Sequence, residues 1–95
     1  MMTLSEAELT NAICLHVAER RGVKPENVEV VLVWEEETGY SAEIAVEGRH
    51  IVWIEANMVE AVQRYLWREY HMQVFRDGIS FRLEDEILVD VQTAS

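Results

Sequence analysis

The stretch "VEVVLVWEEETGYSAEIAVEGRHIVWIE", residues 28–55, decides the fold. Apolar residues recur at every second position through three runs, and two short segments containing Gly39 and Gly48 separate the runs. Alternation with a period of two is typical of strands, and glycine readily takes the positive φ that tight turns require. Two hairpins in succession therefore predict a three-stranded antiparallel meander.

The two faces of this meander differ in their expected surroundings. Val30, Leu32 and Ile44 share one phase, and we expect helices to cover them. The opposite face keeps Val31, Val33 and Ala45, together with one of two alternating sets, Ile51 with Trp53 or Val52 with Ile54. An apolar outer face invites a cover, which is either the C-terminal hairpin or another copy of the chain.

Three consecutive glutamates, residues 35–37, fall at the first of the two reversals. Side chains that follow one another in a turn diverge, so these carboxylates do not readily converge on one ion. The calcium-loop pattern of alternating oxygen ligands is missing here and from a second acidic segment, residues 84–86. Both segments are therefore expected to be turns rather than metal sites, and the first is expected to be solvated.

A capping box marks the start of a first helix. Ser5 and Glu8 precede an apolar periodic segment, and Gly22 supplies a natural end after two arginines. The expected buried face, at helical spacing, comprises Leu9, Ala12, Ile13, His16 and Val17. A helix is therefore predicted between Ser5 and Gly22.

The segment 57–72 predicts a second helix, with Asn57 as N-cap and Glu60 closing its capping box. Its expected buried stripe comprises Met58, Val59, Val62, Tyr65 and Leu66. We expect Leu32, Ile44 and Leu66 to be core residues, because each lies on the apolar phase of its own element.

The tail adds two short alternating runs, residues 79–83 and 87–91, on either side of the second acidic turn. The predicted order is α-β-β-β-α-β-β. We expect an α+β fold in one domain, residues 1–95, with an antiparallel meander sheet packed by two helices.

The charge balance restricts the partners. Eighteen acidic residues against eight basic ones give a formal net charge of −10, which repels phosphate backbones and anionic lipid. The single cysteine, Cys14, cannot form an internal disulfide, and the chain shows neither a signal-peptide pattern nor an apolar run of membrane-spanning length. We therefore expect a cytoplasmic protein that binds neither nucleic acid nor membrane.

No constellation of residues predicts catalysis, a metal or a cofactor. Cys14 and His16 stand two apart, so on a helix they point about 200° away from each other. His16 is expected to be a hydrogen-bonded core residue, whereas His50 and His71 come from other elements. We expect no enzyme activity. The alternative is a small enzyme or metal-dependent domain that uses the scattered histidines and carboxylates.

The order helix, three strands, helix is also that of a double-stranded-RNA-binding domain. That module needs lysines at the start of its second helix to contact phosphates, and here the corresponding stretch reads "EANMVEA", residues 55–61. An RNA-binding module is therefore a remote alternative that rests on topology alone.

Two apolar residues interrupt the polar faces of the helices. Trp67 lies roughly 180° from the start of the buried stripe, on the side of His71. Leu15 lies among polar residues of the first helix, and tryptophan is enriched at interface hot spots. We expect a protein–protein interaction or regulatory module that acts as a homodimer, with a second apolar surface around Val33 and Trp53. The predicted interface residues are Trp67, His71, Leu15, Val33 and Trp53.

Two long stretches, "NAICLHVAERRGVKPENVEVVLVWEEETGYSAEI" (residues 11–44) and "IEANMVEAVQRYLWREYHMQVFRDGISFRL" (residues 54–83), resemble the YxcD-like family of short acidic proteins from Bacillus and relatives. The most specific parts are "IEANMVEA" and "YHMQVFRDGI". The resemblance covers nearly the whole chain and implies a bacterial cytoplasmic setting. That family has no assigned activity, so the resemblance brings no catalytic residue.

Overall fold

The computed structural model describes residues 1–93, in which two helices and six strands are arranged. In chain order these are β1 (Met2–Leu4), α1 (Glu6–Arg21), β2 (Glu29–Glu35), β3 (Gly39–Val46), β4 (Arg49–Ile54), α2 (Glu55–Tyr70), β5 (Ile79–Leu83) and β6 (Ile87–Val91). Short 3₁₀ turns, η1 (Pro25–Asn27) and η2 (Arg76–Gly78), precede β2 and β5. The strands form two three-stranded antiparallel sheets, β2–β3–β4 and β1–β6–β5. The predicted α+β class is confirmed.

The N-terminal strand β1 is the element that the sequence did not predict. It pairs antiparallel with β6, with Met2 opposite Val91 and Leu4 opposite Val89. The tail hairpin therefore belongs to a separate sheet and does not join the meander. A strand this short carries too little alternation to be recognised from sequence, because its partner β6 specifies it.

The meander has the register that its alternation requires. Val30 lies opposite Ile44 on β3. Ile44 in turn lies opposite Ile51 on β4. These residues share the inner face with Leu32 and Trp53, and all of them belong to the core or pack against it. The predicted phase of β2 and β3 is therefore confirmed.

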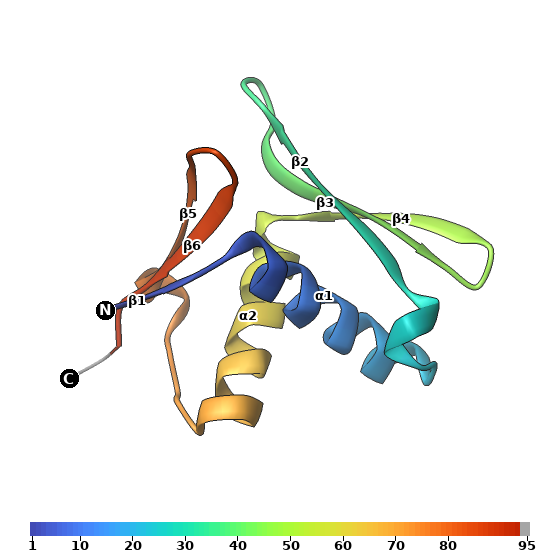
Figure 1. The fold of residues 1–95 in the computed structure, drawn as a ribbon, viewed down its shortest axis with the longest axis horizontal. Coiled ribbons are helices and arrows are strands. Elements are labelled where there is room, and N and C mark those ends of the chain that lie inside the picture. The colour runs from blue at the N-terminus through green and yellow to red at the C-terminus, as the bar shows by residue number, and fades with distance from the viewer. Residues whose placement is uncertain (94–95) are drawn as a thin grey trace.

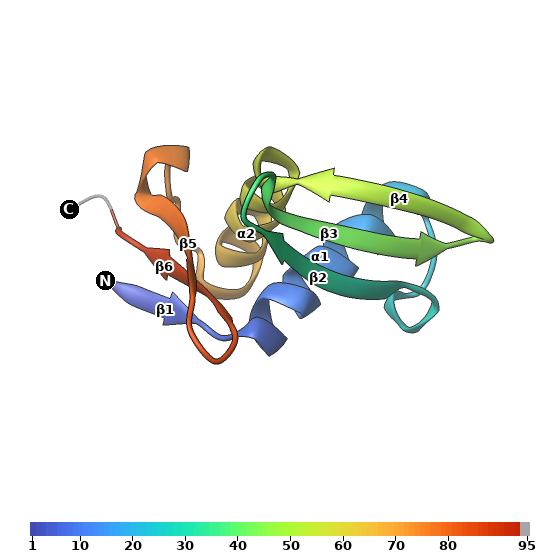
Figure 2. The ribbon, with the colours of Figure 1, turned by 90° about the horizontal axis from the view of Figure 1, so that it is seen from above.

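Both helices lie on one side of the β2–β3–β4 sheet (Figure 1). α1 packs against β2, α2 packs against β3 and β4, and the helices pack against each other. Seen from above, the β1–β6–β5 sheet stands beside the meander, near the start of α1 (Figure 2). The rings of Tyr40 in β3 and Phe81 in β5, with centroids 5.5 Å apart, join the two sheets. The core therefore continues from the helices into the second sheet.

The capping box of α1 is present as predicted. Ser5 Oγ accepts a hydrogen bond from the Glu8 N–H at 3.1 Å, and Glu8 Oε1 accepts one from the Ser5 N–H at 3.2 Å. Gly22 follows the last turn with a φ of 68°, and its N–H donates to the Ala18 carbonyl. The predicted start and end of this helix are confirmed.

Helix α2 begins earlier than predicted. Its N-cap is Ile54, which has no side-chain acceptor, and Asn57 occupies the third helical position. Asn57 Oδ1 accepts the Ile54 N–H at 3.1 Å, so one half of a capping box is present. The prediction of Asn57 as N-cap is wrong because β4 runs directly into the helix, with no loop between them.

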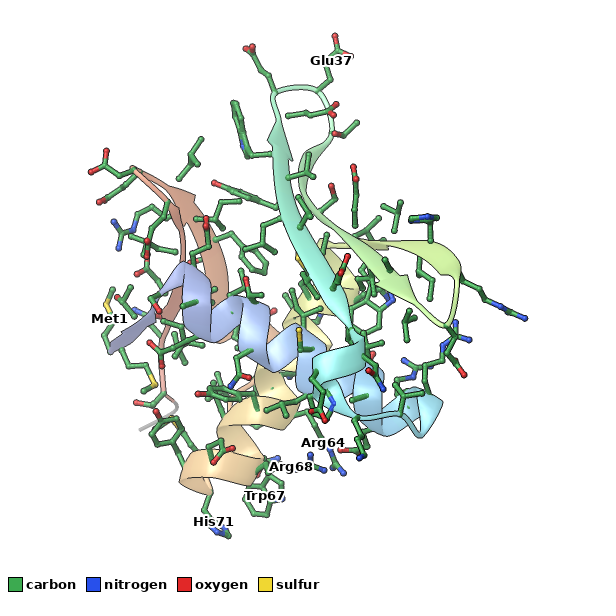
Figure 3. All side chains as sticks on the ribbon, turned by 45° about the vertical axis from the view of Figure 1, so that its right-hand side comes forward. Met1, Glu37, Arg64, Trp67, Arg68 and His71 are labelled. Carbon is green, nitrogen blue, oxygen red and sulfur yellow. The ribbon has the colours of Figure 1, made fainter. Side chains whose placement is uncertain are left out.

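The two acidic turns make different contacts. Glu36 and Glu37 lie exposed at the β2–β3 tip, as predicted (Figure 3). Glu86, in the β5–β6 turn, instead accepts the N–H of Glu6 in the first turn of α1, and Glu6 Oε1 accepts the Ile87 N–H. A carboxylate is stabilising at a helix N-terminus. Glu86 therefore ties the second sheet to the start of α1.

The core contains the residues expected from helix and strand phase. Ile44 and Leu66 are 1% and 0% exposed. Leu32 is half-buried and packs against the core, because β2 is an edge strand of its sheet. The sequence therefore identified the centre of the core and overestimated the burial of its edge.

His16 is the one polar residue that is buried within residues 1–93, at 8% exposure. Its ring lies edge-on to Trp53, with centroids 5.6 Å apart. Neither ring nitrogen has a hydrogen-bond partner among the described residues, and Glu60 Oε1 lies 3.7 Å from Nε2, beyond hydrogen-bonding distance. The predicted burial is confirmed, but the predicted hydrogen bond is wrong, because the surrounding face of α1 supplies apolar neighbours.

The environment of His16 favours its neutral form. Burial, the largest effect, lowers the pKa of His16 below its ordinary value of 6.5. The carboxylate of Glu60 opposes this shift, and Arg20 adds to it. The unfolded chain therefore binds a proton more readily than the folded protein.

We predict that truncating the core destabilises the protein far more than changing the acidic tip. Ile44→Ala and Leu66→Ala should each lower the free energy of unfolding by about 2 to 4 kcal/mol, because each leaves a cavity. Glu36→Gln should change it by less than about 0.5 kcal/mol. Urea denaturation measures all three variants, and the reverse order of effects would show that the strand phase is misassigned.

We also predict that His16 makes the protein less stable in mild acid. Stability contributed by neutral His16 is present above about pH 6.5 and is lost as the pH falls towards the lower folded pKa. Between pH 7 and 5.5 the wild type should lose more unfolding free energy than His16→Leu, because only the wild type has a histidine that the unfolded chain protonates more readily. Urea denaturation across this range measures the difference, with His71→Asn as the exposed-histidine control, since asparagine tolerates the positive φ at this position. Parallel curves for wild type and His16→Leu would contradict the prediction.

Candidate functional site

The five predicted interface residues do not form one surface. Trp67 and His71 lie together near the end of α2, with ring centroids 5.7 Å apart. Leu15 faces α2, Val33 lies on the outer side of the meander, and Trp53 lies on its inner side. The structure therefore offers separate candidate surfaces, which we describe in turn.

The first surface surrounds Trp67, which is 52% exposed. Arg64 and Arg68 flank it on the same helix (Figure 3). Both arginines form ion pairs with Glu19 of α1, and Arg64 Nη2 lies 2.9 Å from Glu19 Oε1. The hydrogen bond from Arg64 is the largest of the effects that lower the pKa of Glu19. The arginines thus clamp the two helices, and the Trp67–His71 pair faces solvent beside them.

A groove of about 370 Å³ continues from Trp67 towards the segment after α2. Its lining comprises Gln63, Trp67, Gln73, Val74 and Phe75. The Gln63 side chain donates to the Val74 carbonyl at 3.0 Å and fixes that segment, whereas Phe75 is 62% exposed. Phe75 was not among the predicted interface residues, because it lies between α2 and β5, where no periodic pattern indicates which side chains are exposed.

Leu15 is not a surface residue of the expected kind. It is half-buried and, with Tyr65, lines a small enclosed space between α1 and α2. The expectation that grouped Leu15 with an exposed face is wrong, because α2 crosses α1 on that side.

The second surface is the outer face of the meander, made of three cross-strand rows. The rows are Glu29–Ala45–His50, Val31–Glu43–Val52 and Val33–Ser41–Ile54. Val31, Val52 and Ile54 are 59%, 64% and 61% exposed. The C-terminal hairpin does not cover these rows, because it pairs with β1 in the second sheet (Figure 2). Of the two covers weighed from the sequence, the hairpin is excluded.

Trp53 lies on the inner face and not beside Val33. A two-residue turn joins β3 to β4, and both of its residues have positive φ. This turn sets β4 in the phase that points Val52 and Ile54 outward. The expectation of an outer surface around Val33 and Trp53 is therefore corrected: Ile54 is the outward neighbour in the row of Val33.

The chemically reactive side chains are dispersed. Cys14 is half-buried, its Sγ lies 3.8 Å from the Val28 carbonyl, and burial raises the pKa of its thiol. A raised pKa reduces the thiolate fraction that a nucleophile needs. Within residues 1–93, no group of three or more His, Cys, Asp or Glu side chains is placed to hold a metal ion.

Neither α1 nor α2 is long and apolar enough to cross a membrane, and no other helix occurs in the described part of the chain. Comparison with curated proteins found no match, and comparison with solved structures found none either. The family described as "Protein of unknown function (DUF2653)" matches residues 1–86. Because this match spans most of the chain, the protein belongs to the DUF2653 family.

Proposed function

We propose that the protein is a small interaction module that forms a homodimer through the outer face of its meander. The observation that carries this proposal is the exposure of Val31, Val52 and Ile54 on a sheet face that no element of residues 1–93 covers. Contiguous apolar residues on a surface are typical of interaction sites.

The outer face can pair with itself across a two-fold axis. A two-fold axis running nearly parallel to β3 places β2 of one copy over β4 of the other. Glu29 then faces His50 of the other copy, Val31 faces Val52, and Val33 faces Ile54, each pair occurring twice. If the axis is tilted by about 15° from β3, the strands of the two copies cross at twice that angle, about 30°. This is the crossing angle that two packed, twisted sheets prefer.

The size of the face implies a weak dimer. Three strands about 4.8 Å apart, with six residues rising about 3.3 Å each, span roughly 14 by 20 Å. The area of such a face is roughly 280 Å² on each copy, or about 560 Å² over both copies, which is below the size of stable specific complexes. Glu43, in the middle of β3, meets its own copy at the axis, and this like-charge contact weakens the dimer further.

The cellular setting is part of the same proposal. A single half-buried Cys14 suits a reducing compartment, since it has no second cysteine to pair with. The resemblance to the YxcD-like family of Bacillus and relatives favours a bacterial cytoplasm. We therefore expect a regulatory or adaptor role among cytoplasmic proteins.

We predict that the wild type is a reversible dimer and that Ile54→Glu raises its dissociation constant by at least about tenfold. The two-fold contact uses each residue twice, so one substitution removes two contributions. Glu43→Gln should tighten the dimer, because it removes the like-charge contact at the axis. Sedimentation equilibrium between about 10 and 100 µM measures both effects.

One control variant and two contrary outcomes make this test decisive. Trp67→Glu changes an exposed aromatic residue on α2 and should leave the dimer intact. If Trp67→Glu dissociates the dimer and Ile54→Glu does not, the interface lies at the end of α2. A wild type that is strictly monomeric over the whole range would refute the homodimer.

The alternatives are a metal-dependent enzyme and an RNA-binding module, and titration separates them from the proposal. We predict no stoichiometric complex of micromolar affinity with calcium, zinc or short RNA duplexes at about 150 mM salt, where weak screened attraction fades. Divalent ions should also leave the melting temperature unchanged, since a ligand of the native state would raise it. A stoichiometric zinc or calcium complex would support the metal-dependent class, and an RNA complex would support the other.

A further inference from the structure

A recess lies where the last turn of α1 meets the inner side of β4 and the first turn of α2. Its volume is about 390 Å³, and it is lined by Val17, Arg20, Arg21, Ile51, Trp53 and Asn57. We call it the α1–β4 recess. Its size falls within the range of small-molecule sites, which measure about 300 to 1,000 Å³.

The charge of this recess is opposite to that of the chain as a whole. The chain carries eighteen acidic and eight basic residues, yet the lining contains two arginines and no acid. Neither Arg20 nor Arg21 forms an ion pair within residues 1–93, and the same holds for Lys24, Arg49 and Arg76. What sets Arg20 and Arg21 apart is that both line one recess, whose lining contains no carboxylate.

The remaining lining residues supply an apolar wall and one more donor. Ile51 and Trp53 are half-buried on the inner face of β4, and the ring of His16 supports Trp53 from behind, at 5.6 Å between centroids. Asn57 Oδ1 is occupied by the Ile54 N–H, so its amide N–H groups remain to donate to a ligand. The N-terminal turn of α2, with its positive dipole end, lies at the same place.

We propose that the α1–β4 recess binds a small organic anion whose phosphate or carboxylate group lies between Arg20 and Arg21 and whose apolar body packs on Ile51 and Trp53. Guanidinium groups match these oxyanions in geometry and donate charge-assisted hydrogen bonds. A small anion contacts only these nearby donors. An extended polyanion would also be repelled by the rest of the chain, whose net charge is −10. This site lies on the opposite face of β4 from the proposed dimer contact.

Three probes of matched chemistry test the proposal. Phenyl phosphate supplies both the anionic group and the apolar ring, inorganic phosphate supplies the anionic group alone, and phenol supplies the ring alone. In ¹⁵N–¹H spectra of the full chain at low salt, phenyl phosphate should shift the Trp53 indole and Asn57 amide signals with saturation, at least about tenfold more tightly than either fragment. The indole signals of Trp34 and Trp67 serve as internal references.

Variants then assign the anion to the arginines. Arg20→Gln and Arg21→Gln should each raise the dissociation constant for phenyl phosphate by about tenfold, because each removes a hydrogen bond to a charged group. Arg76→Gln removes an equal charge in η2, far from the end of α1 (Figure 1), and should leave the affinity unchanged. An unchanged spectrum away from the recess confirms that each variant is folded.

Three results would overturn the proposal. The first is the absence of a saturable Trp53 shift with up to about 10 mM phenyl phosphate, a concentration that reveals even weak sites. The second is equal binding of phenyl phosphate and inorganic phosphate, which would mean charge attraction without a built pocket. The third is an equal effect of Arg76→Gln and Arg20→Gln on the affinity for phenyl phosphate, which would mean that net charge alone determines this affinity.

Discussion

The packing of α1 and α2 against one face of the β2–β3–β4 sheet is the interaction on which the rest of the structure depends. It buries Ile44 in the middle of the sheet, Ile13 on α1 and Leu66 on α2, each almost completely. Burial of such side chains supplies the main favourable free energy of a small domain. Because side chains alternate along a strand, covering one face determines which residues remain on the other. The exposed outer face is thus a consequence of the same packing that forms the core.

The acidic residues fall into two groups with different consequences. Glu19 and Glu86 are tied to other elements, one to the arginines of α2 and the other to the first turn of α1. Glu36 and Glu37 lie exposed in the β2–β3 turn and have no ion pair among residues 1–93. A similar run of acids in the sequence can therefore be a structural connection or a solvated turn. The turn that contains Glu86 differs from the turn that contains Glu36 and Glu37 in lying beside a helix N-terminus.

Local patterns made much of this fold predictable from sequence. The capping box of Ser5 and the alternation around Ile44 each depend on residues close in the chain, so they were identified correctly. The strand β1 and the earlier start of α2 depend on contacts or connections that a local pattern does not contain. Trp53 was placed on the wrong face, although the two-residue turn before β4 fixes its phase.

The candidate sites were harder to predict than the fold. Val33 and Trp67 were predicted as interface residues because they continue or break a periodic pattern within one element. The recess around Arg20 and Arg21 combines α1, β4 and α2, and the ordinary place of arginines in the last turn of a helix gave no sign of it. Sites assembled from three elements require the topology to be known first.

The edge strand β4 connects the two proposed surfaces. Its residues alternate, so that Ile51 and Trp53 line the α1–β4 recess while Val52 and Ile54 form part of the outer face. A change in the position of β4 that a bound anion favours would alter both surfaces together. Coupling of this kind is reciprocal, so an anion that strengthens dimerisation by a given factor is itself bound more tightly by the dimer by the same factor. β4 is hydrogen-bonded to β3 along one edge and to no strand along the other within residues 1–93, which makes it less constrained than the central strand β3 and better able to carry such a coupling.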